Sequence, residues 1–239
     1  MLRRSVLADI QRIRRPIFTT FELARLSDRS ASATTQALKH LEEQGVVEKI
    51  YRGIWGLAGS ERLSAASVIP FLFPRTRAYV SFISALHLYD IIEQIPQVMT
   101  LASPAHTKTI RTRLGTYSVH RIAPSFFAGF RWYKDEGRFL IAEPEKALID
   151  SLYLSARKKR QYGHFPELHF PRTFSFDRAE EWVERIPSLP LRKSAGKKLR
   201  AIMERYERRQ DGVRGKAGAN AGKEKSQAAA RISQNLRRG

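Results

Sequence analysis

The chain has 239 residues, enough for one large domain or two modest ones with a substantial apolar core. Its formal net charge is +20 and its pI is about 10.7, an excess that favours an acidic partner, most often nucleic acid. The absence of cysteine excludes disulfides, thiolate metal sites and cysteine catalysis.

An anionic membrane surface is the main rival to nucleic acid as the acidic partner. The sequence has no long uncharged apolar run and no amphipathic helix with a bulky apolar stripe. Its start, MLRRSVLADIQRIRR, is charged and lacks the apolar core of a signal peptide. We therefore expect a cytoplasmic protein without a membrane partner.

The first 60 residues begin with two helical patterns. Apolar side chains at helical spacing predict a first helix that ends before Pro16, with the stripe Leu2, Val6, Ile10 and Ile13. After the extended pair Ile17-Phe18, we expect Thr20 to cap a second helix. The apolar residues of this helix are Phe21, Leu23, Ala24 and Leu26.

Turn residues 27–30 separate the second helix from a third one, which Ser30 or Ser32 can cap and Gly45 ends. Its expected buried face is Ala33, Ala37, Leu38 and Leu41. Residues 46–50 and 54–57 are β-prone and are joined through Arg52-Gly53 as a tight hairpin. This order of elements is that of a winged helix-turn-helix, a fold that usually binds DNA.

The third helix and the hairpin carry the candidate DNA contacts. Polar residues on the exposed face of the helix can reach base edges or phosphates, and its positive N-terminal end favours a phosphate. Basic residues on the hairpin would meet a neighbouring groove or the backbone. The candidates are Arg29, Ser30, Ser32, Thr35, Gln36, Lys39, Lys49 and Arg52. Two alternatives remain: the residues form a solvated surface, or the fold serves protein contacts.

Residues 61–209 mix helical and β-prone segments, so we expect an α+β protein. The β-prone segments are residues 78–80, a meander over 98–122, and residues 130–133 and 139–142. We expect a small antiparallel sheet from them. The expected helices cover residues 61–73, a segment opened by Ser81 or Ser84, a segment opened by Glu143-Pro144, residues 176–186 and residues 194–209.

Four segments in this region resemble the AbiEi-type antitoxin family of abortive-infection systems. They are YVSFISAL (Tyr79–Leu86), LGTYSVHRI (Leu114–Ile122), SFFAGF (Ser125–Phe130) and IAEPEKALID (Ile141–Asp150). Their order and spacing match the family, as does the preceding winged helix, so the resemblance covers about residues 1–155. One departure is Asp90, where members often carry a glycine after the SAL helix.

The resemblance implies a transcriptional repressor that is also an antitoxin. The N-terminal domain would bind inverted repeats of double-stranded DNA in its own promoter. The second, mixed α/β antitoxin domain would counteract a nucleotidyltransferase-like toxin, in many members without a stable complex. We therefore expect residues 1–60 to be the DNA-binding domain and residues 61–209 to be the antitoxin domain with a helical C-terminal extension. Residues 210–239 are poor in large apolar side chains and rich in Gly, Ala and charge, which predicts a disordered basic tail.

An enzyme is the alternative class, because Glu143, Glu145 and Asp150 form a tight acidic cluster. The structural interpretation of this cluster is that Glu145 favours the helix N-terminus and that Lys146 and Asp150 form an i,i+4 pair. The sequence has no P-loop, no GxGxxG motif and no histidine frame for a metal, so we expect no cofactor. The alternatives are a nucleic-acid-processing enzyme that the winged helix targets, and a protein-interaction adaptor.

Overall fold

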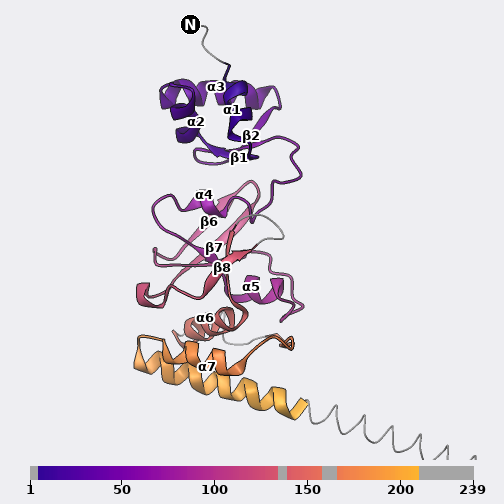
Figure 1. Cartoon of the computed structure of the whole chain (residues 1–239), viewed down its shortest axis with the longest axis vertical. Coiled ribbons are helices and arrows are strands. Elements are labelled where there is room, and N and C mark those ends of the chain that lie inside the picture. The colour runs from indigo at the N-terminus through magenta and orange to yellow at the C-terminus, as the bar shows by residue number, and fades with distance from the viewer. Residues whose placement is uncertain (1–4, 134–138, 158–165, 210–239) are drawn as a thin grey trace, which may run out of the picture.

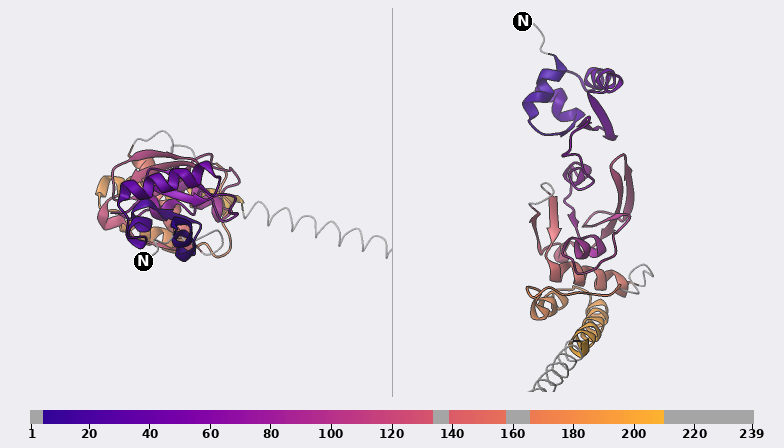
Figure 2. Two further views of the ribbon diagram at one scale, coloured as in Figure 1. Left: turned by 90° about the horizontal axis from the view of Figure 1, so that it is seen from above. Right: turned by 90° about the vertical axis from the view of Figure 1, so that its right-hand side faces the viewer.

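The computed structural model describes residues 5–133, 139–157 and 166–209, and these form a mixed α+β protein with two sheets. The molecule is elongated (Figure 1). An N-terminal unit, residues 5–57, lies at one end, and a second unit, residues 78–209, follows with its sheet in the middle and its last helices at the far end. The side view in Figure 2 shows the same sequence along the long axis: the N-terminal unit, then the sheet of the second unit, then the last helices.

The N-terminal unit combines three helices with a three-stranded antiparallel sheet. Along the chain the elements are α1 (Val6–Ile13), β1 (Ile17–Thr19), α2 (Thr20–Leu26), α3 (Ala31–Glu43), β2 (Val47–Tyr51) and β3 (Ile54–Leu57). The strand order is β1-β3-β2, which leaves β2 at an edge. The predicted hairpin is confirmed, and Gly53 takes the positive φ of 68° that its turn requires.

Two local expectations for these helices need correction. Thr19, not Thr20, caps α2: its hydroxyl accepts the N–H of Glu22, because Thr20 already has helical geometry. On α3, Ser30 is the cap, but Ala33 is exposed, and Thr34 and Leu38 are the fully buried positions. The rest of the predicted face is confirmed, since Leu38 is buried and Ala37 and Leu41 pack against the same core. Thr34 takes the place of Ala33 in the first turn, where its hydroxyl donates to the Ser30 carbonyl.

The three-stranded sheet is apolar on both faces. One face packs against α1 to α3 through Phe18, Val47 and Trp55. On the other face, Ile17, Ile50 and Ile54 pack into the main core of the second unit. The two units are therefore packed against each other and not merely linked.

Residues 61–73 do not form the expected long helix. Helical geometry is confined to α4 (Ile69–Leu72), with Pro70 in its first turn. Upstream, Ser64 and Ser67 exchange side-chain and backbone hydrogen bonds in a local turn. Pro70 has no N–H to continue a helix across it, and the serines satisfy the backbone without one.

The second unit contains a six-stranded mixed sheet in place of the expected antiparallel meander. The strands are β4 (Tyr79–Val80), β5 (Met99–Ser103), β6 (Lys108–Thr112), β7 (Gly115–Arg121), β8 (Phe130–Tyr133) and β9 (Phe139–Ala142). Their order is β6-β7-β5-β4-β9-β8, and the pairs β5–β7 and β4–β9 are parallel. Because β5 is almost entirely buried, it lies inside the sheet, and the more exposed β6 takes the edge.

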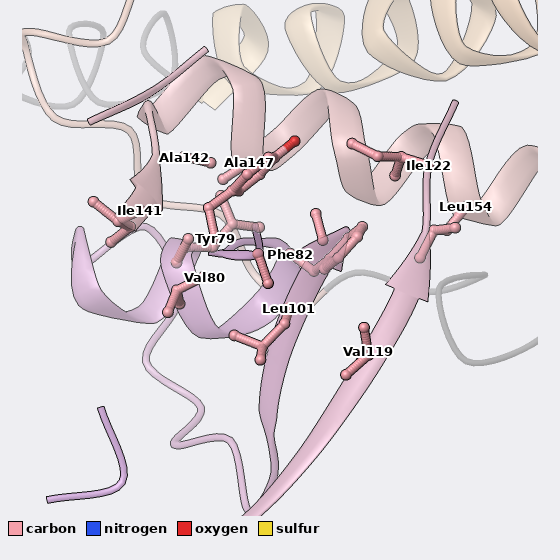
Figure 3. Close-up of a cluster of buried hydrophobic side chains, with 14 of the residues drawn as sticks. Tyr79, Val80, Phe82, Leu101, Val119, Ile122, Ile141, Ala142, Ala147 and Leu154 are labelled. Carbon is pink, nitrogen blue, oxygen red and sulfur yellow. The ribbon is translucent and has the colours of Figure 1, made fainter. Parts of the chain in front are cut away.

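Helices cover this sheet and complete the core (Figure 3), in which side chains from β4, β5, β7 and β9 meet those of α5 (Phe82–Leu88) and α6 (Pro144–Ala156). The predicted start of α6 at Glu143-Pro144 is confirmed. Below α6 lie α7 (Phe176–Glu184) and a helix over residues 189–209.

The last helix starts earlier than the predicted residue 194. Pro190 lies in its first turn, where a proline costs no helical hydrogen bond. The predicted disordered tail at residues 210–239 lies outside the described residues.

Candidate nucleic-acid interface

Helix α3 presents a polar face whose residue spacing is that of one helical surface. Ser32, Gln36 and Lys39 are exposed and lie four and three positions apart, which places them side by side. Ser30 at the N-cap is also exposed, and its hydroxyl accepts the N–H of Ala33. Lys39 makes no ion pair with any of the described residues, so its charge is available to an anion.

Thr35 and Arg29 contribute less surface than the other candidates. Thr35 is half-buried, and its hydroxyl donates to the Ala31 carbonyl at 2.7 Å, so it can only accept a hydrogen bond from a base. Arg29 is half-buried just before the N-cap, and its backbone N–H donates to Ala24. It remains close to the helix end that favours an anion.

Charge is distributed unevenly along α3. The first turn has no acidic residue, whereas Glu42 and Glu43 lie in the last turn, where Glu43 approaches His40 at 3.7 Å. The end of the helix with the positive partial charge is thus also the end without carboxylates. An anion is attracted to the N-terminal two-thirds of the helix and repelled from its end.

The hairpin holds Lys49 and Arg52 in different environments. Arg52 is exposed in the turn between β2 and β3, next to Gly53. Lys49 is exposed on β2, where its ammonium lies 5.8 Å from the centre of the buried Trp55 ring. Trp55 in turn donates from its indole N–H to Thr20 Oγ1 at 2.9 Å, which connects the hairpin to α2.

Glu42 is a residue of this surface that the sequence patterns did not single out. Its Oε1 accepts the backbone N–H of Lys49 at 2.9 Å, so α3 and β2 are joined directly. No sequence signal identifies this contact, because it joins a side chain to a backbone group on an edge strand seven residues away.

A second group of polar residues is buried in the second unit. The Lys146 ammonium contacts Asp150, donates a hydrogen bond to the Tyr79 hydroxyl oxygen at 3.1 Å, and lies 3.8 Å from the centre of the Phe126 ring. Asp150 also accepts hydrogen bonds from Tyr79 at 3.0 Å and Ser81 at 2.7 Å. The side chains of Lys146 and Asp150 are 0% exposed, so no substrate reaches them in this structure.

Burial controls the protonation of this group. Burial lowers the pKa of Lys146, although Asp150 raises it. Burial, followed by the nearby Asp150, raises the pKa of Tyr79 well above its ordinary value. The predicted i,i+4 pair is therefore present, but it is a core ion pair.

The three carboxylates of the predicted acidic cluster have separate partners. Glu143 binds Arg178 at 3.0 Å, and Glu145 accepts the backbone N–H of Ser175 at 3.0 Å through Oε1. Asp150 binds the group described above. Each carboxylate thus contacts a different neighbour of α6.

No model of a known protein family matches the sequence, and none of the curated proteins is significantly similar to it. The resemblance to AbiEi-type antitoxins therefore stays a prediction. Asp90, the residue that departs from the family pattern, has a φ of 55°, the left-handed conformation that a glycine adopts without strain.

The described residues contain no group of three or more His, Asp or Glu side chains placed to hold a metal ion. Within the same ranges, no helix is both long enough and apolar enough to cross a membrane.

Proposed function

We propose that the N-terminal unit is a winged helix-turn-helix that binds double-stranded DNA. The observation that carries the proposal is the order α1-β1-α2-α3-β2-β3 with a β1-β3-β2 sheet, combined with an exposed polar face on α3. In such folds the second helix of the pair enters the major groove, and the hairpin contacts the adjacent backbone or groove. Here these elements are α3 and the β2–β3 hairpin.

The candidate residues divide by chemistry into two classes. Gln36 and Ser32 are neutral and suit base edges, since a glutamine amide can pair with adenine through two hydrogen bonds. Lys39, Lys49 and Arg52 suit phosphates, which they would bind without regard to sequence. The exposed N-cap of α3 adds a positive partial charge for a further phosphate.

We further propose that DNA binding serves repression of the protein's own promoter, and that the second unit counteracts a toxin of the nucleotidyltransferase type. This part of the proposal rests on the four segments that resemble AbiEi-type antitoxins. Two of them form the buried polar group of the second unit: the first segment supplies Tyr79 and Ser81, and the last supplies Lys146 and Asp150. We propose that the protein acts by binding and not by catalysis.

The test is a titration of the purified chain onto its own upstream DNA, followed by fluorescence anisotropy. The variant Lys39→Ala/Arg52→Ala removes two exposed charges from the proposed surface. Its matched control, Arg172→Ala/Lys193→Ala, removes two exposed charges from the far end of the molecule. We expect the first pair to weaken binding at least tenfold more than the control, on the basis of about 1 kcal/mol per contact.

Equal loss in both double variants would refute the assignment of the surface, and no binding of the wild-type chain to any upstream repeat would refute the repressor proposal. Gln36→Ala distinguishes base contact from phosphate contact. It should lower the affinity for the operator while leaving the dependence of the binding constant on salt unchanged.

The antitoxin half has a separate test, co-expression with the product of the neighbouring gene. If that product is not toxic, or if this protein does not relieve its toxicity, the antitoxin proposal fails while the DNA-binding proposal stands.

A further inference from the structure

Strand β2 contains an irregularity at the point where the two units meet. The register pairs Lys49 with Trp55 and Tyr51 with Ile54, so Ile50 has no cross-strand partner. Such a bulge bends the strand and redirects the residues that follow it. The next residues lead into the turn that carries Arg52, so the geometry of the bulge determines where the hairpin tip points.

Both units hold this bulge. On one side, Glu42 of α3 accepts the N–H of Lys49 at 2.9 Å. On the other side, the turn between β6 and β7 reaches up to the N-terminal unit (Figure 2, right), and the N–H of Arg113 donates to the Ile50 carbonyl at 3.1 Å. The freed carbonyl of the bulge residue is thus bonded to a residue of the other unit.

The Arg113 side chain adds a second link to the same strand. Its Nε lies 3.1 Å from Oε2 of Glu48, whose side chain is 22% exposed, whereas that of Arg113 is 63% exposed. Beneath this pair, Ile50 itself packs in the main core of the second unit. Backbone, ion pair and apolar contact therefore converge on residues 48–50.

We propose that Arg113 is a positioning residue of the DNA-binding surface: from the second unit, it holds the bulge of β2 and so orients the hairpin relative to α3. The inference rests on the proposed function, because the orientation matters only if α3 and the hairpin meet one DNA duplex. In this proposal the second unit helps to set the shape of the DNA-binding surface, although Arg113 itself does not contact DNA.

The test uses the full chain and separates positioning from net charge. Arg113→Ala and its matched control Arg111→Ala remove the same charge from neighbouring positions, and Arg111 is exposed on β6. We expect Arg113→Ala to weaken operator binding about two- to fivefold relative to Arg111→Ala, the range for a partly exposed ion pair. Glu48→Ala is the more decisive variant. Removal of a negative charge would by itself favour DNA binding, whereas loss of the ion pair with Arg113 should weaken it.

A reciprocal variant completes the cycle. Glu48→Arg/Arg113→Glu restores the pair and the net charge, and it should bind better than either of its single changes. Hydrogen exchange of the backbone amides of residues 47–54 supplies a readout without DNA. Exchange there should accelerate in Arg113→Ala and Glu48→Ala but not in Arg111→Ala, at an unchanged midpoint of global unfolding.

Tighter or unchanged binding by Glu48→Ala, or equal binding by the Arg113 and Arg111 variants, would overturn the inference. If the wild-type chain binds no upstream DNA but the exchange pattern is as expected, the proposed function fails, and the result supports the stabilisation of the hairpin by Arg113. If the chain binds DNA but exchange in the hairpin does not respond, the inference alone fails.

Discussion

Removal of Asp150 should destabilise the protein more than any change on its surface. Lys146 is fully buried, and its ammonium has Asp150 as its charged partner together with the Tyr79 hydroxyl and the Phe126 ring. Asp150→Ala leaves this cation in the core without a counter-charge. It also removes the acceptor of the Tyr79 and Ser81 hydroxyls.

The expected cost is about 3–5 kcal/mol of the free energy of unfolding, the range for breaking a buried ion pair from one side. Lys146→Met should cost less, because the two hydroxyl donors remain on Asp150. The double change Lys146→Met/Asp150→Leu removes both charges, and replacement of a buried pair by apolar residues is often close to neutral. We therefore expect the double variant to be more stable than Asp150→Ala alone.

The measurement is urea unfolding of the wild type, both single variants and the double variant, with midpoints and slopes compared in a double-mutant cycle. A cost of less than about 1 kcal/mol for Asp150→Ala would refute the reasoning, since that is the scale of an exposed pair. So would a double variant whose cost equals the sum of the two single costs.

The pH dependence of Asp150→Ala is a further check on the same reasoning. Burial lowers the pKa of Lys146 below its ordinary 10.5, and Asp150→Ala removes the carboxylate that opposes this shift. The unfolded state then binds the extra proton in the window below pH 10.5, so the stability of the variant should rise as the pH rises through that window. A flat profile for the variant would show that Lys146 escapes to solvent.

Three other predictions concern stability. Burial raises the pKa of Tyr117 to about 12 from 10.0, so the stability that this residue contributes is complete below pH 10 and should be lost as the pH rises from 10 to 12. In a pH series of unfolding midpoints, Tyr117→Phe should show a smaller decrease over this window than the wild type. Gly129→Ala should cost about 2–4 kcal/mol in urea unfolding, because an added Cβ would lie 2.4 Å from the Trp182 ring at a φ of 73°; a loss below 1 kcal/mol would mean that the ring moves aside freely. Asp90→Gly should raise stability by about 0.5–1 kcal/mol by removing left-handed strain, and an unchanged melting temperature would contradict this.

Local chemistry predicted much of the N-terminal unit. Ser30 is a helix cap, and Gly45 and Gly53 take the positive φ that their turns require, because these preferences act over three or four residues. The exposure of Ser32, Gln36 and Lys39 follows from the same periodicity. Where prediction failed locally, at Thr19 and Ala33, the error was a single position.

The pairing of strands in the second unit was not predictable in this way. β5 and β7 are parallel neighbours with β6 between them along the chain, whereas the alternating pattern suggested a meander. Alternation determines which residues face the core but does not specify the neighbour of a strand. That choice depends on contacts across the whole sheet.

The helices and hairpin of the N-terminal unit, the polar face of α3 and the start of α6 at Glu143-Pro144 were predictable from the sequence, because each depends on neighbours along the chain. The partners of the buried polar groups were not predictable in this way, because they come together only in the folded chain. Asp150 lies 69 residues from Ser81, and its pairing with Lys146 became a core contact only when β4, α5 and α6 packed together. The hydrogen bond from the Arg113 N–H to the Ile50 carbonyl is another such contact. Every residue has a backbone carbonyl, so the sequence does not indicate which N–H will bond it; that depends on which N–H the folded chain places beside it.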